Sequence, residues 1–224
     1  MEELGRIHQL LIPLQGYTIT INLEPVIMTW IVICVLLVFG FLTIRKRGML
    51  PGPFQVIGEF IVSALYQLTE DAMDEELAKK YSPLICALFL FLVFSNWISL
   101  IPHMEEPTKD LNTPLSLGLM GFVLSHYEGI KAKGIKEYIK SYFEPMFFMM
   151  PLNVIGELAK VVSISFRLFG NIMGGSIIIL VISYLSYSLI IPPVLNLFFG
   201  IFVGTIQAFV FTMLTIVYIS VQVK

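Results

Sequence analysis

Charged residues are scarce in this chain of 224 residues, where Lys, Arg, Asp and Glu together make up 13% and hydrophobic residues 57%. A soluble globular domain carries about 25% charged residues. This shortage, with a mean hydropathy of +0.85, is too large for a soluble core and predicts an all-α, polytopic membrane protein. The net charge of −2 gives no indication of nucleic-acid binding.

Residues that hold metals, haem or phosphates are also few. Cys34 and Cys86 lie in apolar segments without CxxC spacing, so we interpret them as small buried side chains. His8, His103 and His126 lie in or beside expected loops, and the chain has no HExxH motif and no phosphate-binding glycine loop. We therefore expect no cofactor, no metal site and no catalysis by this chain, which weighs against an intramembrane enzyme or a haem protein.

Apolar runs of membrane-crossing length alternate with charged segments. The acidic N-terminus, MEELGRIHQLLIPL, lacks the basic region of a cleavable signal peptide. Residues 26–44 form an uncharged run of about 19 residues, enough to cross a hydrocarbon core of about 30 Å. Basic residues at 45–47 follow at once, which places this end in the cytoplasm and the N-terminus outside. We expect residues 54–77, which mix apolar and acidic positions, to form an amphipathic helix at the cytoplasmic surface.

Two further spans follow. Residues 83–101 form the second, and the proline-rich, acidic segment after it fits an external loop. Residues 115–124 begin a short third span, with Tyr127 as an alternative end. Four lysines then lie within residues 131–140, which indicates a cytoplasmic loop.

The C-terminal third is too long for ordinary spans. Residues 146–189 are apolar almost throughout, and a continuous helix of about 40 residues would measure about 60 Å, twice the bilayer core. It must either break into two spans or lie steeply inclined. Residues 194–221, after Pro192-Pro193, form a second over-long helix. A cytoplasmic Lys224 requires an even number of crossings, so we predict a hairpin of two long inclined helices.

About five membrane helices and one surface helix make up the predicted molecule. We interpret residues 1–224 as a single membrane domain with three parts: an N-terminal span and amphipathic helix (1–80), the second and third spans (81–140), and the inclined hairpin (141–224).

Arg167 is the most informative residue, because residues 145–223 hold only two other charges, Glu157 and Lys160. A guanidinium does not deprotonate in proteins, and at membrane depth it costs roughly 2.5–3.5 kcal/mol on insertion scales. A helical spacing of three or four residues puts it at the centre of one polar stripe, made of Lys160, Ser163, Arg167, Asn171 and Gly174. On the last helix, the corresponding spacing unites Gly200, Gly204, Gln207 and Phe211.

No counter-charge for Arg167 is evident in the hairpin. Glu157 lies about 15 Å away along the helix axis and is three residues from Lys160, so we expect these two to pair. The partner of Arg167 is then a carboxylate on another chain, an ion or water. Alternatively, the guanidinium joins the two helices through carbonyl groups and the Gln207 amide.

Two sequence elements carry a family resemblance: SISFRLFGN around Arg167, and IQAFVFTMLTIVYIS near the C-terminus. With FSNWISLIPH and DLNTPLSLGL, they resemble subunit a of the F-type ATP synthase over nearly the whole chain. The resemblance implies a non-catalytic stator subunit beside a rotating ring of c subunits, with a peripheral stalk subunit b, in a bacterial plasma membrane. Two half-channels would carry H⁺ or Na⁺ to the ring, coupled to ATP synthesis.

The resemblance also implies roles for particular residues. Arg167 would face each ring carboxylate, with Asn171 and Gln207 near it, and Asp110 and Asn112 would lie near the external access route. Further possible channel-lining positions are Glu157, Lys160, Ser163, Ser176, Gly200 and Gly204. Many relatives carry a titratable residue where this chain has Ser176 and Gly200, so a hydrated path is expected here. A stand-alone cation channel or secondary transporter is the alternative function, but we find no internal repeats of the kind transporters show.

Overall fold

The structure is a computed structural model that describes residues 9–14, 17–44, 52–101, 104–143, 148–185 and 191–223. The helices are α1 (Leu23–Ile44), α2 (Pro53–Ala72), α3 (Glu75–Trp97), α4 (Asn112–Lys133), α5 (Ile135–Phe143), α6 (Met149–Leu185), α7 (Ile191–Leu197) and α8 (Gly204–Val223). Two 3₁₀ turns, η2 (Ile98–Leu100) and η3 (Pro107–Lys109), and a π-helical segment, η4 (Phe198–Val203), complete them. The predicted helical fold with two long C-terminal helices is confirmed.

A β-hairpin precedes α1 and was not anticipated. Strands β1 (Gln9–Leu14) and β2 (Tyr17–Asn22) pair antiparallel, with Leu14 opposite Tyr17. The sequence of β2 alternates Thr and Ile, residue types that are enriched in strands.

Four helical stretches in the described part of the chain are long and apolar enough to cross a membrane: residues 23–43, 75–100, 149–185 and 191–223. Helix α4, the predicted third span, is not among them, because glycine, serine and charged residues interrupt its apolar positions. Its crossing of the membrane therefore remains a prediction.

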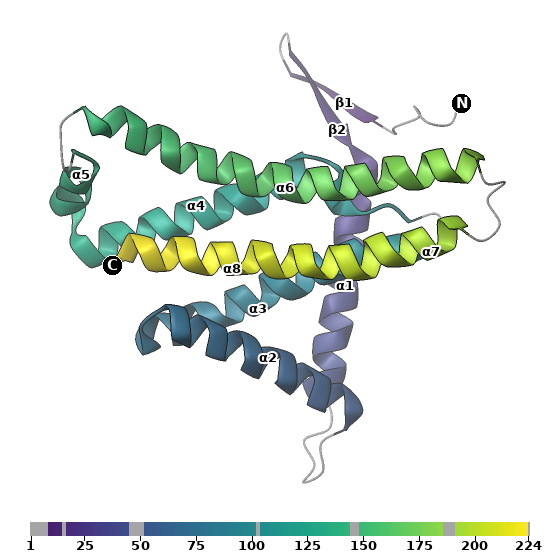
Figure 1. Ribbon diagram of the computed structural model, residues 1–224, viewed down its shortest axis with the longest axis horizontal. Coiled ribbons are helices and arrows are strands. Elements are labelled where there is room, and N and C mark those ends of the chain that lie inside the picture. The colour runs from purple at the N-terminus through teal and green to yellow at the C-terminus, as the bar shows by residue number, and fades with distance from the viewer. Residues whose placement is uncertain are drawn as a thin grey trace.

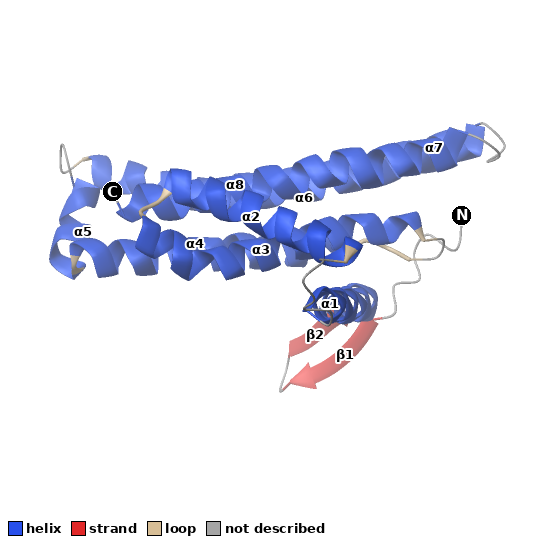
Figure 2. Ribbon diagram, turned by 90° about the horizontal axis from the view of Figure 1, so that it is seen from below, coloured by secondary structure: helices blue, strands red, loops and turns tan. Residues whose placement is uncertain are grey.

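The helices form two layers. Figure 1 shows α6 and α8 lying side by side in opposite directions, and Figure 2 shows α3 and α4 forming a second layer against them. Helix α1 runs crosswise to these helices and is seen end-on in Figure 2. The main apolar core fills the space between the layers, with Leu92, Leu168 and Phe211 among its fully buried side chains.

Helix α6 settles the question of the long apolar segment. It runs without a break for 37 residues, through both Arg167 and Gly175, so two spans joined by a turn are excluded. At 1.5 Å per residue its length is about 55 Å, so in a bilayer core of about 30 Å it must lie inclined.

The last helix differs from the uniform helix expected. Residues 191–223 are helical throughout, but the six residues of η4 form wider π-helical turns. These turns surround Gly200, where an added Cβ would lie 3.2 Å from Leu100 Cδ2. Single π-helical turns inside α-helices are frequent at functional sites.

Three smaller expectations differ from the structure. Helix α3 begins at Glu75, so Pro83 lies inside it rather than at its start; Asp74 occupies the N-cap position and acidic residues fill the first turn. Cys34 is exposed on the surface of α1, whereas Cys86 is buried as predicted. His126 lies within α4, hydrogen-bonded to Tyr142 of α5.

Candidate functional site

Arg167 lies at the middle of α6, on a face directed away from the rest of the chain. Its side chain is exposed, and the adjacent Phe166 is 50% exposed on the same helix. Among the described residues, its guanidinium makes no hydrogen bond and no ion pair. The charge is therefore available to a group outside the described part of this chain.

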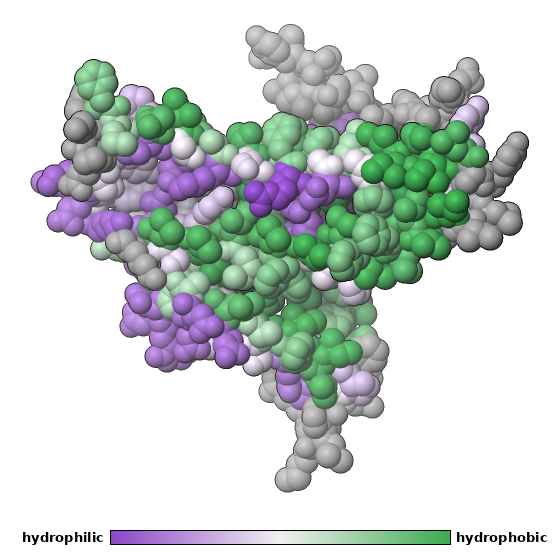
Figure 3. Space-filling model, viewed as in Figure 1, coloured by the Kyte–Doolittle hydropathy of each residue, from purple (hydrophilic) through white to green (hydrophobic). Residues whose placement is uncertain are grey.

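The polar stripe around Arg167 is a surface feature. Ser163, Arg167 and Asn171 are exposed, and Lys160 and Gly174 are partly exposed. Figure 3 shows a hydrophilic band on the α6–α8 face that runs from the α5 end to the middle of the molecule. The surface beyond it, toward α7, is hydrophobic, so the band ends in an apolar region.

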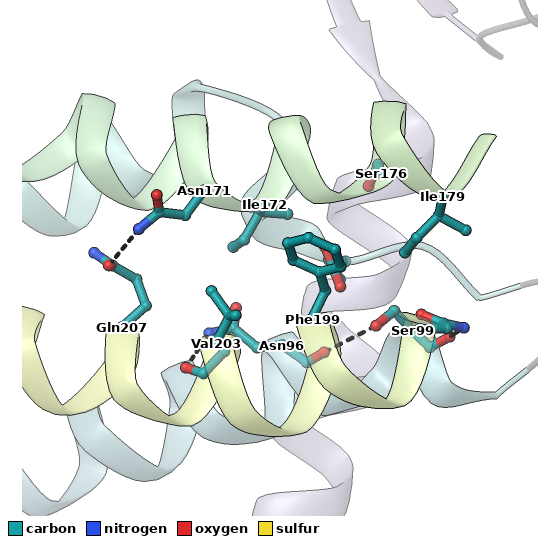
Figure 4. A pocket seen from close by; sticks show the side chains of 12 residues that line it. Asn96, Ser99, Asn171, Ile172, Ser176, Ile179, Phe199, Val203 and Gln207 are labelled. Atoms are coloured by element: carbon teal, nitrogen blue, oxygen red, sulfur yellow. Dashed lines mark hydrogen bonds between the residues drawn. The ribbon is translucent and has the colours of Figure 1, made fainter. Parts of the chain in front are cut away.

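Asn171 and Gln207 join the two long helices. Asn171 Nδ2 donates a hydrogen bond of 2.7 Å to Gln207 Oε1, and Figure 4 shows the two side chains pointing toward each other from α6 and α8. Gln207 therefore bonds Asn171, and the alternative in which the Gln207 amide holds the guanidinium is not what the structure shows. The Gln207 side chain is 4% exposed, and its Nε2 has no hydrogen-bond partner among the described residues.

A polar cavity of about 50 Å³ adjoins this pair on the side toward α7. Its walls come from α3, η2, the segment before η3, α6, α7, η4 and α8 (Figure 4). The polar lining residues are Asn96, Ser99, Glu106, Asn171, Ser176, Asn196 and Gln207. Of the predicted channel residues, the fold thus brings together Asn171, Ser176, Gly204 and Gln207.

Hydrogen bonds hold two of the lining amides, Asn96 and Asn196, in place. Asn96 Nδ2 donates to the Gly204 carbonyl oxygen over 2.9 Å, and Asn96 Oδ1 accepts from Thr108 Oγ1 over 3.0 Å. Asn196 Nδ2 donates to the Ser99 carbonyl oxygen over 3.1 Å. An added Cβ at Gly204 would lie 2.8 Å from Asn96 Cβ, so the glycine is what allows α3 and α8 to approach so closely.

Glu106 is the lining residue that sequence reasoning missed. It lies just before η3, half-buried. Burial raises the pKa of its carboxyl to about 7, although Ser99 and Lys109 act in the opposite direction. Asn96 and Ser99 were also not predicted as site residues. Their spacing of three within the apolar run of α3 and η2 could have indicated a shared polar face.

Glu157 and Lys160 lie on the other side of Arg167, toward α5. Lys160 Nζ donates to Glu157 Oε1 over 2.6 Å, as the spacing predicted, and lies 5.6 Å from the centre of the Tyr218 ring. Both residues border a narrow crevice between α4, α6 and α8. This crevice is separate from the cavity at Asn171.

Asp110 and Asn112 occupy a third place, beside α1. Asp110 Oδ2 accepts from Asn22 Nδ2 over 2.7 Å, and Asp110 Oδ1 accepts from the Asn112 backbone N–H over 2.9 Å. Both residues border an open cavity of about 490 Å³ between α1, α3 and α4. Ser163 and Gly200 line none of these three cavities.

The chain matches known proteins over most of its length. The model of the ATP synthase A chain family matches residues 26–220. ATP synthase subunit a of Moorella thermoacetica is 39% identical over 197 residues, covering 88% of this chain and 89% of that protein. The subunit a of Desulforamulus reducens is 35% identical over 213 residues (90% and 80% covered), and that of Helicobacter pylori (strain Shi470) is 39% identical over 181 residues (79% of each).

Long apolar helices, a cation on their outer face without a partner among the described residues, and polar cavities on both sides of it define a multi-pass membrane protein of the ion-transport class. The chain belongs to the family of subunit a of the F-type ATP synthase. It is the ion-translocating, non-catalytic stator subunit of the membrane sector of a bacterial ATP synthase.

Proposed function

We propose that Arg167 is the residue that faces the carboxylates of a rotating ring of c subunits, and that it enforces ion exchange at each of them. The observation that carries this proposal is a permanently charged side chain, exposed beside apolar residues and without a partner among the described residues. A cation within about 4–6 Å lowers the pKa of a carboxyl by 1–3 units, so Arg167 favours release of the ion bound there.

Two half-channels serve this exchange. The cavity at Asn171 and Gln207 forms part of one, and the crevice at Glu157 and Lys160 forms part of the other. They lie on opposite sides of Arg167 along α6, and the fixed positive charge between them repels a cation passing directly. The ion is H⁺ or Na⁺, and each charge contributes about 2.3 kcal/mol per 100 mV of membrane potential.

The surroundings of the subunit complete the proposal. The exposed face of α6 and α8 contacts the ring, and the peripheral stalk subunit b contacts another part of the same chain. The lysine-rich end of α4 and α5 faces the cytoplasm, so the cavity at Asn171 opens to the outside. The chain spans the bacterial plasma membrane with its N-terminus outside and its C-terminus in the cytoplasm, as one membrane domain.

Replacing the guanidinium tests the proposal. In membrane vesicles that carry the whole synthase, Arg167→Ala removes the charge that strips the ring carboxylate. We expect ATP-driven ion uptake to fall to the background of vesicles lacking the membrane sector, while the detached soluble heads hydrolyse ATP normally.

The matched control is Lys136→Ala, which removes an exposed cation of α5 and should leave uptake unchanged. Co-purification of the c ring with each variant reports assembly. Normal coupled uptake by an assembled Arg167→Ala complex contradicts the role given to this residue.

A further inference from the structure

Glu106 differs from every other residue that lines the cavity beside Asn171. The lining side chains contributed by α3, η2, α6, α7, η4 and α8 are amides, hydroxyls or apolar groups, and none of them ionises near neutral pH. Glu106 is the one lining residue with a carboxyl group, and it comes from the segment before η3.

The surroundings of Glu106 favour reversible protonation near neutral pH. Desolvation raises its pKa to about 7, helped by the negative charge of Glu105 and opposed by Ser99 and Lys109. Lys109 Nζ lies 3.2 Å from Glu105 Oε2, so its charge is shared with that carboxylate. A carboxyl whose pKa lies near the working pH is the most effective acid and base in proton transfer.

The cavity also has room and polar groups for water. A water molecule needs roughly 10–15 Å³ of such space, so about 50 Å³ has room for roughly three to five water molecules. The Gln207 amide lines this cavity, 4% exposed, with an Nε2 donor that has no partner among the described residues. Gln207 bonds Asn171, which lies one helical turn after Arg167.

We propose that Glu106 is the proton-relaying carboxyl of this half-channel and that the path it serves carries H⁺. The inference rests on the function proposed above and adds the acid through which protons pass between bulk water and the cavity. In one transfer cycle, the Glu106 carboxylate takes a proton from hydronium on the bulk side and becomes a neutral carboxyl. It then gives this proton to a cavity water, so that one O–H bond forms and one breaks at Glu106 and the carboxylate is restored.

Proton conduction through the membrane sector tests this role. Vesicles carrying the synthase are stripped of the soluble heads, and a potassium diffusion potential drives protons in from the side on which residues 104–109 emerge. The pH on that side is varied from about 5.5 to 8.5. For the unmodified chain we expect a midpoint near 7, because above this pH the protonated fraction of Glu106 falls about tenfold per unit.

Glu106→Gln keeps the size and hydrogen-bonding of the side chain but binds no proton. We expect its conduction at pH 7 to fall at least tenfold and its midpoint to vanish, while Glu106→Asp recovers part of the rate and a titration. Glu137→Gln is the matched control, because it neutralises an exposed carboxylate of α5, away from the cavity, and should change conduction little.

Three outcomes overturn the relay. These are a Glu106→Gln variant with the original rate and midpoint, assembled Gln and Asp variants that are equally slow, and conduction by the unmodified chain that stops when Na⁺ is removed. Each outcome leaves the stator role intact, because that role is tested separately by Arg167→Ala in the same vesicles.

Discussion

Two cations on α6 have different surroundings, and the difference favours only one of them for the role proposed above. Lys160 is neutralised within the chain by Glu157 and lies against the Tyr218 ring. Arg167 has no such group among the described residues. At membrane depth an unpaired guanidinium costs roughly 2.5–3.5 kcal/mol on insertion scales. A carboxylate that pairs with the guanidinium offsets a large part of this free energy.

The Asn171–Gln207 pair supports this site without carrying its charge. In Asn171→Leu, the buried Gln207 amide loses the donor that its oxygen accepts from, which costs about 1–3 kcal/mol. We expect coupled ion uptake to fall several-fold but not to vanish, because Arg167 remains. ATP-driven uptake measures this, with Ser163→Ala on the same exposed stripe as the control. Complete loss of uptake in an assembled Asn171→Leu complex would show that the amide has a role equal to that of Arg167.

Site residues that lie on one helix could be predicted from the sequence. Site residues from distant segments, which only the fold brings together, could not. Arg167 and Asn171 share a face because of the helical period, and Glu157 pairs with Lys160 for the same reason. Glu106 and Asn196 reach the cavity from segments far apart in the chain, so no local spacing indicated them.

Close contact between α3 and α8 depends on a glycine. Gly204 of α8 packs against Asn96 of α3, and the Asn96 amide donates to the Gly204 carbonyl. Small residues at such crossings let two backbones approach, which is how helices gain packing energy in a membrane. The same contact closes one wall of the cavity.

Gly204→Ala should therefore destabilise the subunit. The new Cβ would lie 2.8 Å from Asn96 Cβ, which is close to the backbone and has little freedom to move. Overpacking of this kind costs about 1–3 kcal/mol, so we expect thermal dissociation of the purified complex at a lower temperature. Gly156→Ala, on α6 with open space around it, is the control and should be neutral or slightly stabilising. Equal stability of the two variants would refute the close packing of α3 on α8.

The hydrophobic pattern predicted some features of the two long helices and missed others. Length and apolar composition predicted both elements, and the continuity of α6 then excluded a turn near Gly175. The π-helical segment η4 did not follow from the pattern, because its residues FFGIFV are apolar on all sides and carry no period. The β-hairpin was missed because its strands are short and next to a charged terminus.

The arrangement of the whole molecule relates the cavities to the membrane. Helix α1 lies crosswise to α6 and α8 (Figures 1 and 2), and its 21-residue apolar stretch matches a bilayer crossed nearly at right angles. The long helices then lie steeply inclined, with α7 and α5 near opposite ends of the molecule (Figure 1). Basic residues gather in α4 and α5, whereas the cavity at Glu106 lies at the far end of α4.

This arrangement predicts that the two ends of α4 face opposite sides of the membrane. The helix has 22 residues, and its lysines lie in the last turn, so the positive-inside rule places its C-terminal end in the cytoplasm and its N-terminal end toward the outside. In a chain with Cys34→Ala and Cys86→Ala, we expect Lys131→Cys to react with a membrane-impermeant maleimide only in inverted vesicles. Glu105→Cys should react only in intact cells. Both positions are exposed in the structure, so neither result depends on unfolding. Reaction of both from the same side would mean that α4 does not cross. If that side were the cytoplasmic one, the cavity at Glu106 would open to the cytoplasm instead of the outside.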